Sequence, residues 1–252
     1  MPSTIDINCD LGEETGVEAA IMPSISSANI ACGAHAGNED TIRSTIQLAK
    51  EHQVVVGAHP SYPDRKNFGR VVMPIGLQPL INSVVAQITL VSDIATQEHY
   101  TIGHIKLHGA LYNEAAKNKI LAEALVQTIT TLNPLWVLYG PPESELELAS
   151  FRQGLAYCCE AFVDRSYQDD GSLTPRSDSQ ALINGEKKCI EQALQLIKRK
   201  EVTALSGKLI PLHAATLCIH GDGPQAVLFA NALKKQLQVE GISIRAAYGR
   251  HH

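Results

Sequence analysis

The 252-residue chain has no apolar run that approaches the length of a membrane span and no large cluster of basic residues. A bilayer span needs about 20 consecutive, mainly apolar residues, so the sequence predicts a protein outside the membrane. The formal net charge is −5 and the one basic run, Lys198–Lys200, ends a predicted helix, so nucleic-acid binding is not indicated. The opening MPSTIDINCD lacks the basic and apolar regions of a secretory signal, and we therefore expect a cytoplasmic protein.

Paired cysteines and nucleotide-binding fingerprints are absent as well. None of the six cysteines has the C-x-x-C spacing of zinc sites, and six are too few for a disulfide scaffold of this length, which indicates reduced thiols. No G-x-G-x-x-G follows the first predicted strand, and Gly207-Lys208 is followed by Leu209, where a phosphate-binding loop has serine or threonine. The sequence therefore contains no standard nucleotide-binding loop.

The chain does contain a repeated strand-then-helix pattern. Short apolar segments predict strands at Thr4–Asn8, Ala28–Ala31, Val54–Val56, Tyr100–Leu107, Leu135–Tyr139, Leu155–Cys159 and Thr216–Ile219, with a further one at Ile242–Ala246. No linker or change of composition interrupts the series, and polar residues follow strand after strand. Because the carboxyl ends of barrel strands meet at one mouth, we predict a single α/β domain over residues 1–252, a TIM-like (β/α) barrel of about seven strands.

Capping residues predict several helix limits. Asn38 is suited to cap the helix after the second strand, and Ser177–Gln180 fits a capping box before a later helix. One helix is expected over residues 113–132. Gly223 precedes a last helix whose N-terminus could receive an anion.

The segment Val54–Arg70 carries the strongest functional signal. Its valines predict a buried strand, and two X-Pro pairs then stiffen a loop that holds His59, Asp64, Arg65 and Arg70. Functional side chains of α/β proteins often lie on such loops, because the scaffold fixes the position of a loop whose backbone stays solvated. We therefore expect this loop to line a site.

Charged residues and histidines recur at the ends of the predicted strands. Lys106 and His108 are two positions apart along one strand, so both should point into the same cavity. Histidine and carboxylate groups move protons near neutral pH, whereas lysine and arginine hold carboxylate or phosphate, so the mixture predicts an enzyme for a small anionic substrate. The strand-end residues are Asp10, Glu13, His35, His59, Asp64, Arg65, Arg70, Lys106, His108, Glu160, Asp164, Arg165, His220 and Asp222.

Metal binding is the natural competing interpretation. Asp10, His59 and His108 could form a mixed oxygen and nitrogen site if a barrel brings them together. Their long-range spacing is unspecific. Lys106 argues against a metal, because a cation beside the ligands would oppose a metal ion and assist an anionic substrate.

Six ordered motifs resemble those of the LamB/YcsF family, from about Asp6 to Ala246. They are DINCDLGE (6–13), SANIACGAHAGN (27–38), GAHPSYPDRKNFGR (57–70), KLHGALYN (106–113), EAFVDRSYQDDGSLTPRS (160–177) and HGDGPQA (220–226). The resemblance implies an irregular (β/α) barrel like that of the glycoside hydrolase and deacetylase superfamily. It also implies an ATP-dependent 5-oxoprolinase reaction, in which 5-oxoproline, ATP with Mg²⁺, and water give L-glutamate, ADP and phosphate together with partner subunits B and C. Leu107 departs from the proline that family members usually have.

The resemblance suggests roles for residues in these motifs, with no single residue assigned to each step. The expected catalytic residues are Asp10, His59, Lys106, His108, Glu160 and Asp164, which would move protons and, for Lys106 with the helix after Gly223, neutralise developing phosphate charge. Arg65, Arg70 or Arg165 would hold the substrate carboxylate. The other expected binding residues are Asn8, His35, Asp64, Asn113, Asp170, Arg176, His220 and Asp222. Two further functions stay open: a stand-alone metal-dependent amidohydrolase or deacetylase, and a non-catalytic, ligand-binding regulatory subunit.

Overall fold

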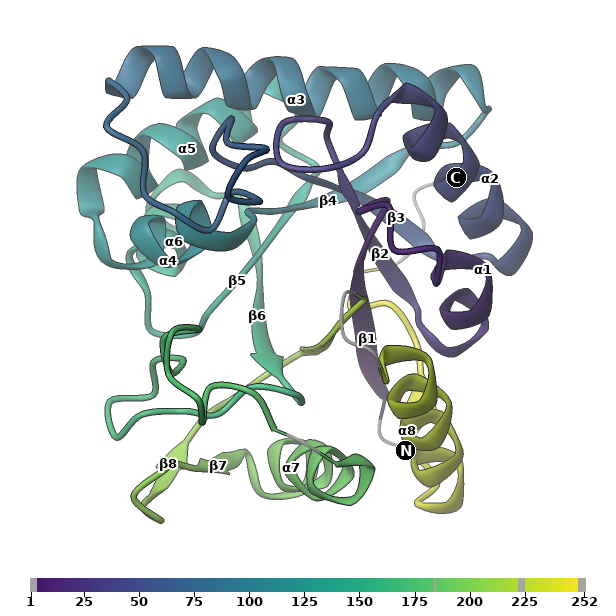
Figure 1. The fold of residues 1–252 in the computed structure, drawn as a ribbon. Coiled ribbons are helices and arrows are strands. Elements are labelled where there is room, and N and C mark those ends of the chain that lie inside the picture. Colours follow the sequence, from purple (N-terminus) through teal and green to yellow (C-terminus); the bar gives the residue numbers. More distant parts are fainter. Residues whose placement is uncertain (1–3, 184, 222–224, 249–252) are drawn as a thin grey trace.

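A computed structural model describes residues 4–183, 185–221 and 225–248 (Figure 1). The centre of the protein is a closed barrel of parallel strands: β1 (Thr4–Leu11), β2 (Ser27–Ala31), β3 (Val55–His59), β4 (Ile102–Lys106), β5 (Val137–Gly140), β6 (Ala156–Phe162) and β9 (Thr216–His220). The barrel closes because β9 pairs with both β6 and β1, and a short β10 (Ser243–Ile244) lies against the start of β1. The predicted seven-stranded TIM-like barrel is confirmed.

The strand register brings the expected site residues to one end of the barrel. Asp10 of β1 lies opposite Asn29 of β2 and His220 of β9, and Ala31 of β2 lies opposite His59 of β3. All strands of a parallel barrel end at the same face. The sheet itself therefore carries Asp10, His59 and His220 to a common mouth.

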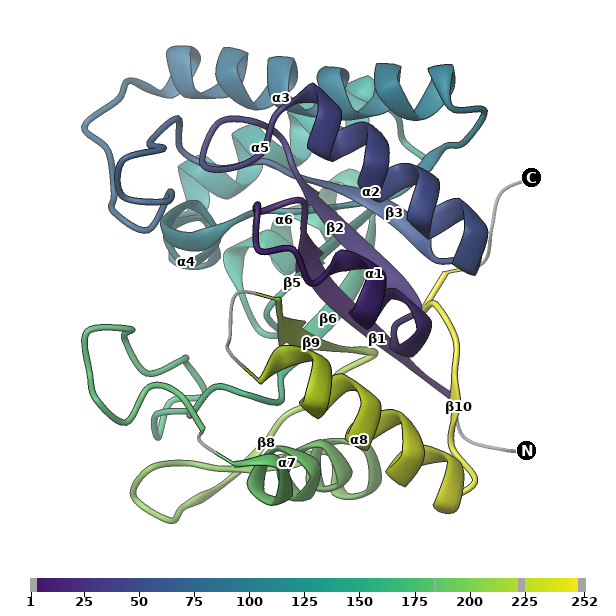
Figure 2. The same ribbon diagram turned by 45° about the vertical axis from the view of Figure 1, so that its right-hand side comes forward.

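Helices cover the outside of the barrel (Figures 1 and 2). They are α1 (Glu18–Ile21), α2 (Glu39–His52), α3 (Leu77–Gln97), α4 (Gly109–Lys117), α5 (Lys119–Leu132), α6 (Glu145–Gln153), α7 (Glu186–Arg199) and α8 (Ala226–Val239), with a 3-10 turn at Met22–Ser24. The short α1 contacts both α2 and α8, and an antiparallel hairpin of β7 (Glu201–Thr203) and β8 (Leu209–Pro211) follows α7. The apolar faces of the helices pack on the barrel and form one large core with it.

The predicted cap of α2 is present. The Asn38 side chain accepts a hydrogen bond from the Thr41 amide at 3.0 Å, and the Thr41 hydroxyl accepts one from the Asn38 amide at 2.8 Å. These bonds satisfy amide groups that have no partner within the first helical turn. Ile42, Ile46 and Ala49 then form the buried face of the helix, as their spacing predicts.

The segment predicted as one helix over residues 113–132 forms two helices. Gly109 adopts a φ of 56°, a left-handed conformation that lets α4 begin directly after β4. Asn118 ends α4 and caps α5, since its side chain accepts a hydrogen bond from the Leu121 amide at 3.2 Å. The apolar pattern continues through both helices, and the break is set by this local cap.

The prediction that a helix begins at Ser177 is wrong. The next helix along the chain, α7, begins at Glu186. Before it, the Asp178 carboxylate accepts a hydrogen bond from the Gln180 amide at 2.8 Å, and such local side-chain bonds favour turns over helix. The predicted cap at Gly223 lies outside the described residues.

Helix α3 is long and apolar enough to cross a membrane, with a mean hydropathy of 1.2 over 18 residues. It is not a continuous apolar run, because polar residues such as Gln87 and Asp93 interrupt it. Leu80, Val84, Ile88 and Val91 of α3 are buried, and the helix contacts β3, β4 and α5. Its apolar composition is that of a helix packed on the barrel.

Gly57 in β3 lies opposite His104 in β4. A Cβ at this position would lie 2.3 Å from His104 Nε2, and the ring cannot move away because it stacks on Tyr139 and bonds Asn29 Oδ1 at 2.7 Å. We expect Gly57→Ala to lower the free energy of unfolding by about 1–3 kcal/mol, the usual cost of overpacking. Chemical denaturation measures this loss of stability. Gly76→Ala is the control, because a Cβ added at Gly76 comes no closer than 3.6 Å to any neighbouring atom. Equal stabilities of the two variants would contradict the expectation.

Candidate active site

Lys106 lies at the centre of the barrel mouth and is only 2% exposed. Its Nζ is 2.8 Å from both Asp10 Oδ1 and Glu160 Oε1, and 3.2 Å from Asn8 Oδ1. Burial alone would lower the pKa of Lys106, but its carboxylate neighbours outweigh burial and raise that pKa well above the ordinary value. The ammonium group therefore stays charged, and its hydrogens are directed at protein acceptors, which favours a positioning role over direct contact with substrate phosphate.

Asp10 presents its two carboxylate oxygens to different partners. Oδ1 accepts hydrogen bonds from Lys106 and, at 2.8 Å, from Asn29 Nδ2, whereas Oδ2 lies 3.3 Å from His59 Nε2. Burial would raise the pKa of Asp10, but His59 and Lys106 hold it well below the ordinary value. Asp10 is thus an ionised carboxylate with one oxygen directed at the histidines.

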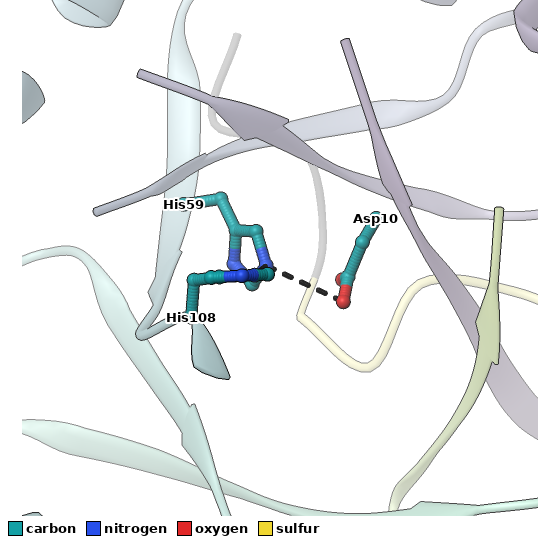
Figure 3. Close-up of side chains that lie close together, drawn as sticks. All are labelled: Asp10, His59 and His108. Atoms are coloured by element: carbon teal, nitrogen blue, oxygen red, sulfur yellow. Dashed lines mark hydrogen bonds and ion pairs between the residues drawn. The ribbon is translucent and has the colours of Figure 1, made fainter. Parts of the chain in front are cut away.

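The tautomers of His59 and His108 follow from their backbone partners. His59 Nδ1 lies 2.8 Å from the Lys106 carbonyl oxygen, and His108 Nε2 lies 2.9 Å from the Phe68 carbonyl oxygen. A carbonyl only accepts, so both of these ring nitrogens carry hydrogen. The other two nitrogens, His59 Nε2 and His108 Nδ1, face each other at 3.0 Å and lie beside Asp10 (Figure 3).

A third histidine, His35, packs against the pair formed by His59 and His108. The His35 ring stacks on His108 with centroids 3.8 Å apart, and its Nδ1 lies 2.9 Å from Ser61 Oγ. Glu13 Oε1 is 3.4 Å from His35 Nε2 and 3.6 Å from His108 Nδ1. Burial lowers the pKa of His35 to about 3, so His35 is a neutral, fixed support for the pair.

A cavity of about 500 Å³ opens above these side chains. The expected site residues that line it are Asp10, His59, Arg70, Lys106, His108, Asn113, Arg165, Arg176 and His220. Asn8, His35, Glu160 and Asp164 lie behind the lining, each in contact with one of its residues. The site therefore combines proton-handling groups with three arginines, as an anionic substrate requires.

Arg165 and Asp164 hold other parts of the cavity in place. The Arg165 guanidinium donates to the Thr174 carbonyl at 2.6 Å and to the Ala181 carbonyl at 3.2 Å, which fixes the loop that carries Arg176. Burial, and next the charge of Arg176, lower the pKa of Arg165 to about 10. The Asp164 carboxylate lies 3.0 Å from both the amide nitrogen and Nδ1 of His220, so it orients that ring.

A sequence profile of the LamB/YcsF family matches residues 5–251. The chain belongs to the LamB/YcsF family. Two family relatives, each named as the A subunit of 5-oxoprolinase, come from Geobacillus thermodenitrificans (strain NG80-2) and Geobacillus kaustophilus (strain HTA426); both are 44% identical to this chain over 247 residues, 96% of either protein. The crystal structure of a lactam utilization protein from Thermus thermophilus matches with a TM-score of 0.90 at 35% identity, over 96% of this chain and 99% of that one.

A more distant match supports the fold class alone. The peptidoglycan deacetylase PdaC from Bacillus subtilis has a TM-score of 0.50 at 10% identity, over 97% of this chain and 87% of that one. At this identity the likeness shows a shared barrel and carries no functional argument. It agrees with the deacetylase-like barrel that the LamB/YcsF motifs imply.

Some expected residues of the LamB/YcsF motifs lie away from the cavity. Asp64 and Asp170 accept hydrogen bonds within their own turns, and the exposed Arg65 pairs with Glu14 at 2.9 Å. Polar side chains in short loops commonly bond to nearby groups of the same loop, and Asp64 and Asp170 do so here. Asp222 lies outside the described residues.

Several residues of the site were not predicted from sequence, among them Asn29, Tyr112 and Phe162. Asn29 holds Asp10 from the neighbouring strand, and its signal is a polar amide between the apolar residues Ala28 and Ile30 of a buried strand. Tyr112 and Phe162 line the cavity, but aromatic residues in these elements look like ordinary core. Burial, and then the neighbouring Glu160, raise the pKa of Tyr112 well above the ordinary value, so its hydroxyl keeps its hydrogen.

Proposed function

We propose that this chain is the A subunit of a 5-oxoprolinase, which opens the lactam ring of 5-oxoproline to give L-glutamate. The observation that carries the proposal is the 44% identity, over 96% of either chain, to proteins named as that same subunit of 5-oxoprolinase. The name of the Thermus protein, a lactam utilization protein, points to the same substrate class. We further propose that the reaction uses ATP with Mg²⁺, requires partner subunits B and C, and takes place in the cytoplasm.

ATP has a chemical purpose in this reaction. A five-membered lactam is a poor electrophile, and transfer of a phosphoryl group to its amide oxygen makes the ring carbon reactive. Water then adds to that carbon and gives up a proton, and the carbon–nitrogen bond breaks as the nitrogen takes up a proton, which leaves a ring-opened acyl phosphate. A second water hydrolyses this acyl phosphate to L-glutamate and phosphate. The chain needs groups that take a proton from water, give one to nitrogen and hold negative charge.

The cavity offers those groups. Asp10, His59 and His108 present a carboxylate oxygen and two ring nitrogens at its floor, within reach of a proton on a bound water. Arg70 and Arg176 line the same cavity and supply positive charge for the substrate carboxylate or the phosphoryl group. The ammonium group of Lys106, which contacts Asp10 Oδ1, keeps the Asp10 carboxylate ionised.

A genetic test separates this proposal from its alternatives. A bacterium that lacks its own A subunit of 5-oxoprolinase, but retains B and C, is supplied with this chain and grown with 5-oxoproline as the sole nitrogen source. We expect growth, matched by cells that carry the Geobacillus protein and absent from cells with the empty vector. Rescue by the Geobacillus protein without rescue by this folded, expressed chain would contradict the proposal.

A further inference from the structure

We propose that Asp10 Oδ2, His59 Nε2 and His108 Nδ1 bind a divalent transition-metal cation of the zinc class. These three atoms lie within 4.8 Å of one another at the floor of the cavity (Figure 3). All three residues are buried; Asp10 and His59 lie in β1 and β3, and His108 follows β4 as the N-cap of α4. The inference rests on this geometry and does not depend on the proposed lactam substrate.

The distances between the donor atoms fit a metal centre. His59 Nε2 lies 3.0 Å from His108 Nδ1 and 3.3 Å from Asp10 Oδ2. Ligands at about 2.0–2.1 Å from a tetrahedral zinc ion are about 3.3 Å apart, so both measured edges have the length of a coordination edge. The third edge, between Asp10 and His108, is within 4.8 Å, so binding one cation requires only that these two side chains approach each other.

Both histidines are oriented as metal ligands are. A ligating histidine usually donates its second ring N–H to a backbone carbonyl or a carboxylate, which fixes the tautomer and turns the lone pair toward the metal. The Lys106 carbonyl does this for His59 at 2.8 Å, and the Phe68 carbonyl does it for His108 at 2.9 Å. His59 Nε2 and His108 Nδ1 therefore face one point, where a bound cation takes the place of a proton shared between the two nitrogens.

The position of Lys106 is compatible with a cation at this point. Its ammonium group contacts Asp10 Oδ1, on the far side of the carboxylate from the histidines, and is also balanced by Glu160 at 2.8 Å. Glu13 Oε1 adds a further carboxylate 3.6 Å from His108 Nδ1. Lys106 is thus held by the carboxylates of Asp10 and Glu160, and its contact with Asp10 leaves Oδ2 of that carboxylate directed at His59. The sequence alone suggests that the charge of Lys106 would oppose a metal ion. The structure removes this objection, because the ammonium group contacts a different oxygen of Asp10 from the one that faces the histidines.

The donor set selects the class of metal. Two imidazole nitrogens and one carboxylate oxygen suit zinc and related transition metals, whereas Mg²⁺ and Ca²⁺ prefer oxygen ligands alone. The site opens on the cavity, which leaves a coordination position for water or a substrate oxygen. Such a cation supplies Lewis acidity and lowers the pKa of a bound water.

Metal binding can be measured on the full chain without any partner or activity assay. The purified protein is stripped with a chelator, dialysed, and titrated calorimetrically with Zn²⁺ and, in parallel, with Mg²⁺. We expect one Zn²⁺ per chain and Mg²⁺ binding at least a hundredfold weaker. His59→Gln and His108→Gln should each lose at least tenfold in zinc affinity, while His213→Gln, at an exposed histidine, should bind as the wild type does. Absence of zinc binding, or equal binding by all variants, would overturn the proposal.

Cobalt spectroscopy on the wild-type protein locates the cation even if a variant fails to fold. Two other groups of possible ligands lie close by: Asp10 with Cys218 and His220, and Glu13 with His35 and His108. Co²⁺ at the proposed site should give visible bands of a nitrogen and oxygen donor set without a thiolate-to-metal charge-transfer band. A thiolate band would place the cation at Cys218 and refute the assignment. Loss of the Co²⁺ spectrum in His35→Gln, with retention in His59→Gln, would refute it as well.

Discussion

Replacing Lys106 with methionine is expected to lower the free energy of unfolding by about 3–5 kcal/mol at pH 7, the usual cost of removing one partner of a buried ion pair. Methionine fills much of the lysine volume but leaves the carboxylates of Asp10 and Glu160 buried without their shared cation. Globular proteins have about 5–15 kcal/mol of stability in total, so the loss should be visible in any denaturant titration. Lys235→Met, on the exposed face of α8, is the matched control and should change stability by less than about 0.5 kcal/mol.

The deficit of Lys106→Met should depend on pH in a defined direction. The folded-state pKa of Asp10 is lowered, so this carboxylate contributes stability above its unfolded pKa of about 3.9 and loses that contribution as pH falls through the folded value. Without Lys106, protonation relieves the uncompensated charge. We therefore expect the difference from wild type, measured with a chelator present, to be largest near neutral pH and to narrow below about pH 4. A deficit that stays constant from pH 7 to pH 4 would mean that lost packing dominates.

His59→Gln should reduce kcat of the assembled enzyme by about 10²–10⁴, the range expected for loss of a group that handles protons in the transition state. His59 Nε2 contacts both Asp10 Oδ2 and His108 Nδ1, so the substitution removes the group that connects the other two. The same loss is expected if the ring acts as a metal ligand. Glutamine keeps a polar side chain of similar size, and the circular dichroism spectrum should show an intact fold.

The measurement for His59 is the rate of glutamate formation from 5-oxoproline at saturating ATP in the presence of the partner subunits. His213→Gln serves as the control, because this histidine is exposed and does not line the cavity. A His59→Gln enzyme within twofold of wild type would show that the mouth of this barrel does not carry the chemistry.

Alternation of side chains along strands was sufficient to predict the floor of the site. Lys106 and His108 both line the cavity, as their two-residue spacing predicts, although β4 ends at Lys106 and His108 keeps an extended backbone as the N-cap of α4. Strand pairing brings Asp10 and His59 beside them. A parallel barrel has one mouth, so any polar strand end is a candidate for the site. This is why the order of strands and helices was enough to predict that these side chains share one cavity.

The partners of individual charges could not be predicted in the same way. Arg65 and Arg165 look equivalent as loop arginines, yet Arg65 pairs with Glu14 on the surface, while Arg165 is buried on two carbonyl groups. The choice depends on loop conformation, which no periodic pattern encodes. The contacts of Lys106 likewise join residues about a hundred positions apart, so its role in balancing buried charge emerges only in the folded barrel.

The most direct test of the central claim is an omission experiment on the purified components. Glutamate and ADP are quantified after 5-oxoproline and ATP are incubated with subunits B and C alone, with this chain alone, and with all three. The account predicts sustained glutamate release only in the complete mixture, and its loss when this chain carries His59→Gln. Equal glutamate release by B and C without this chain would contradict the account.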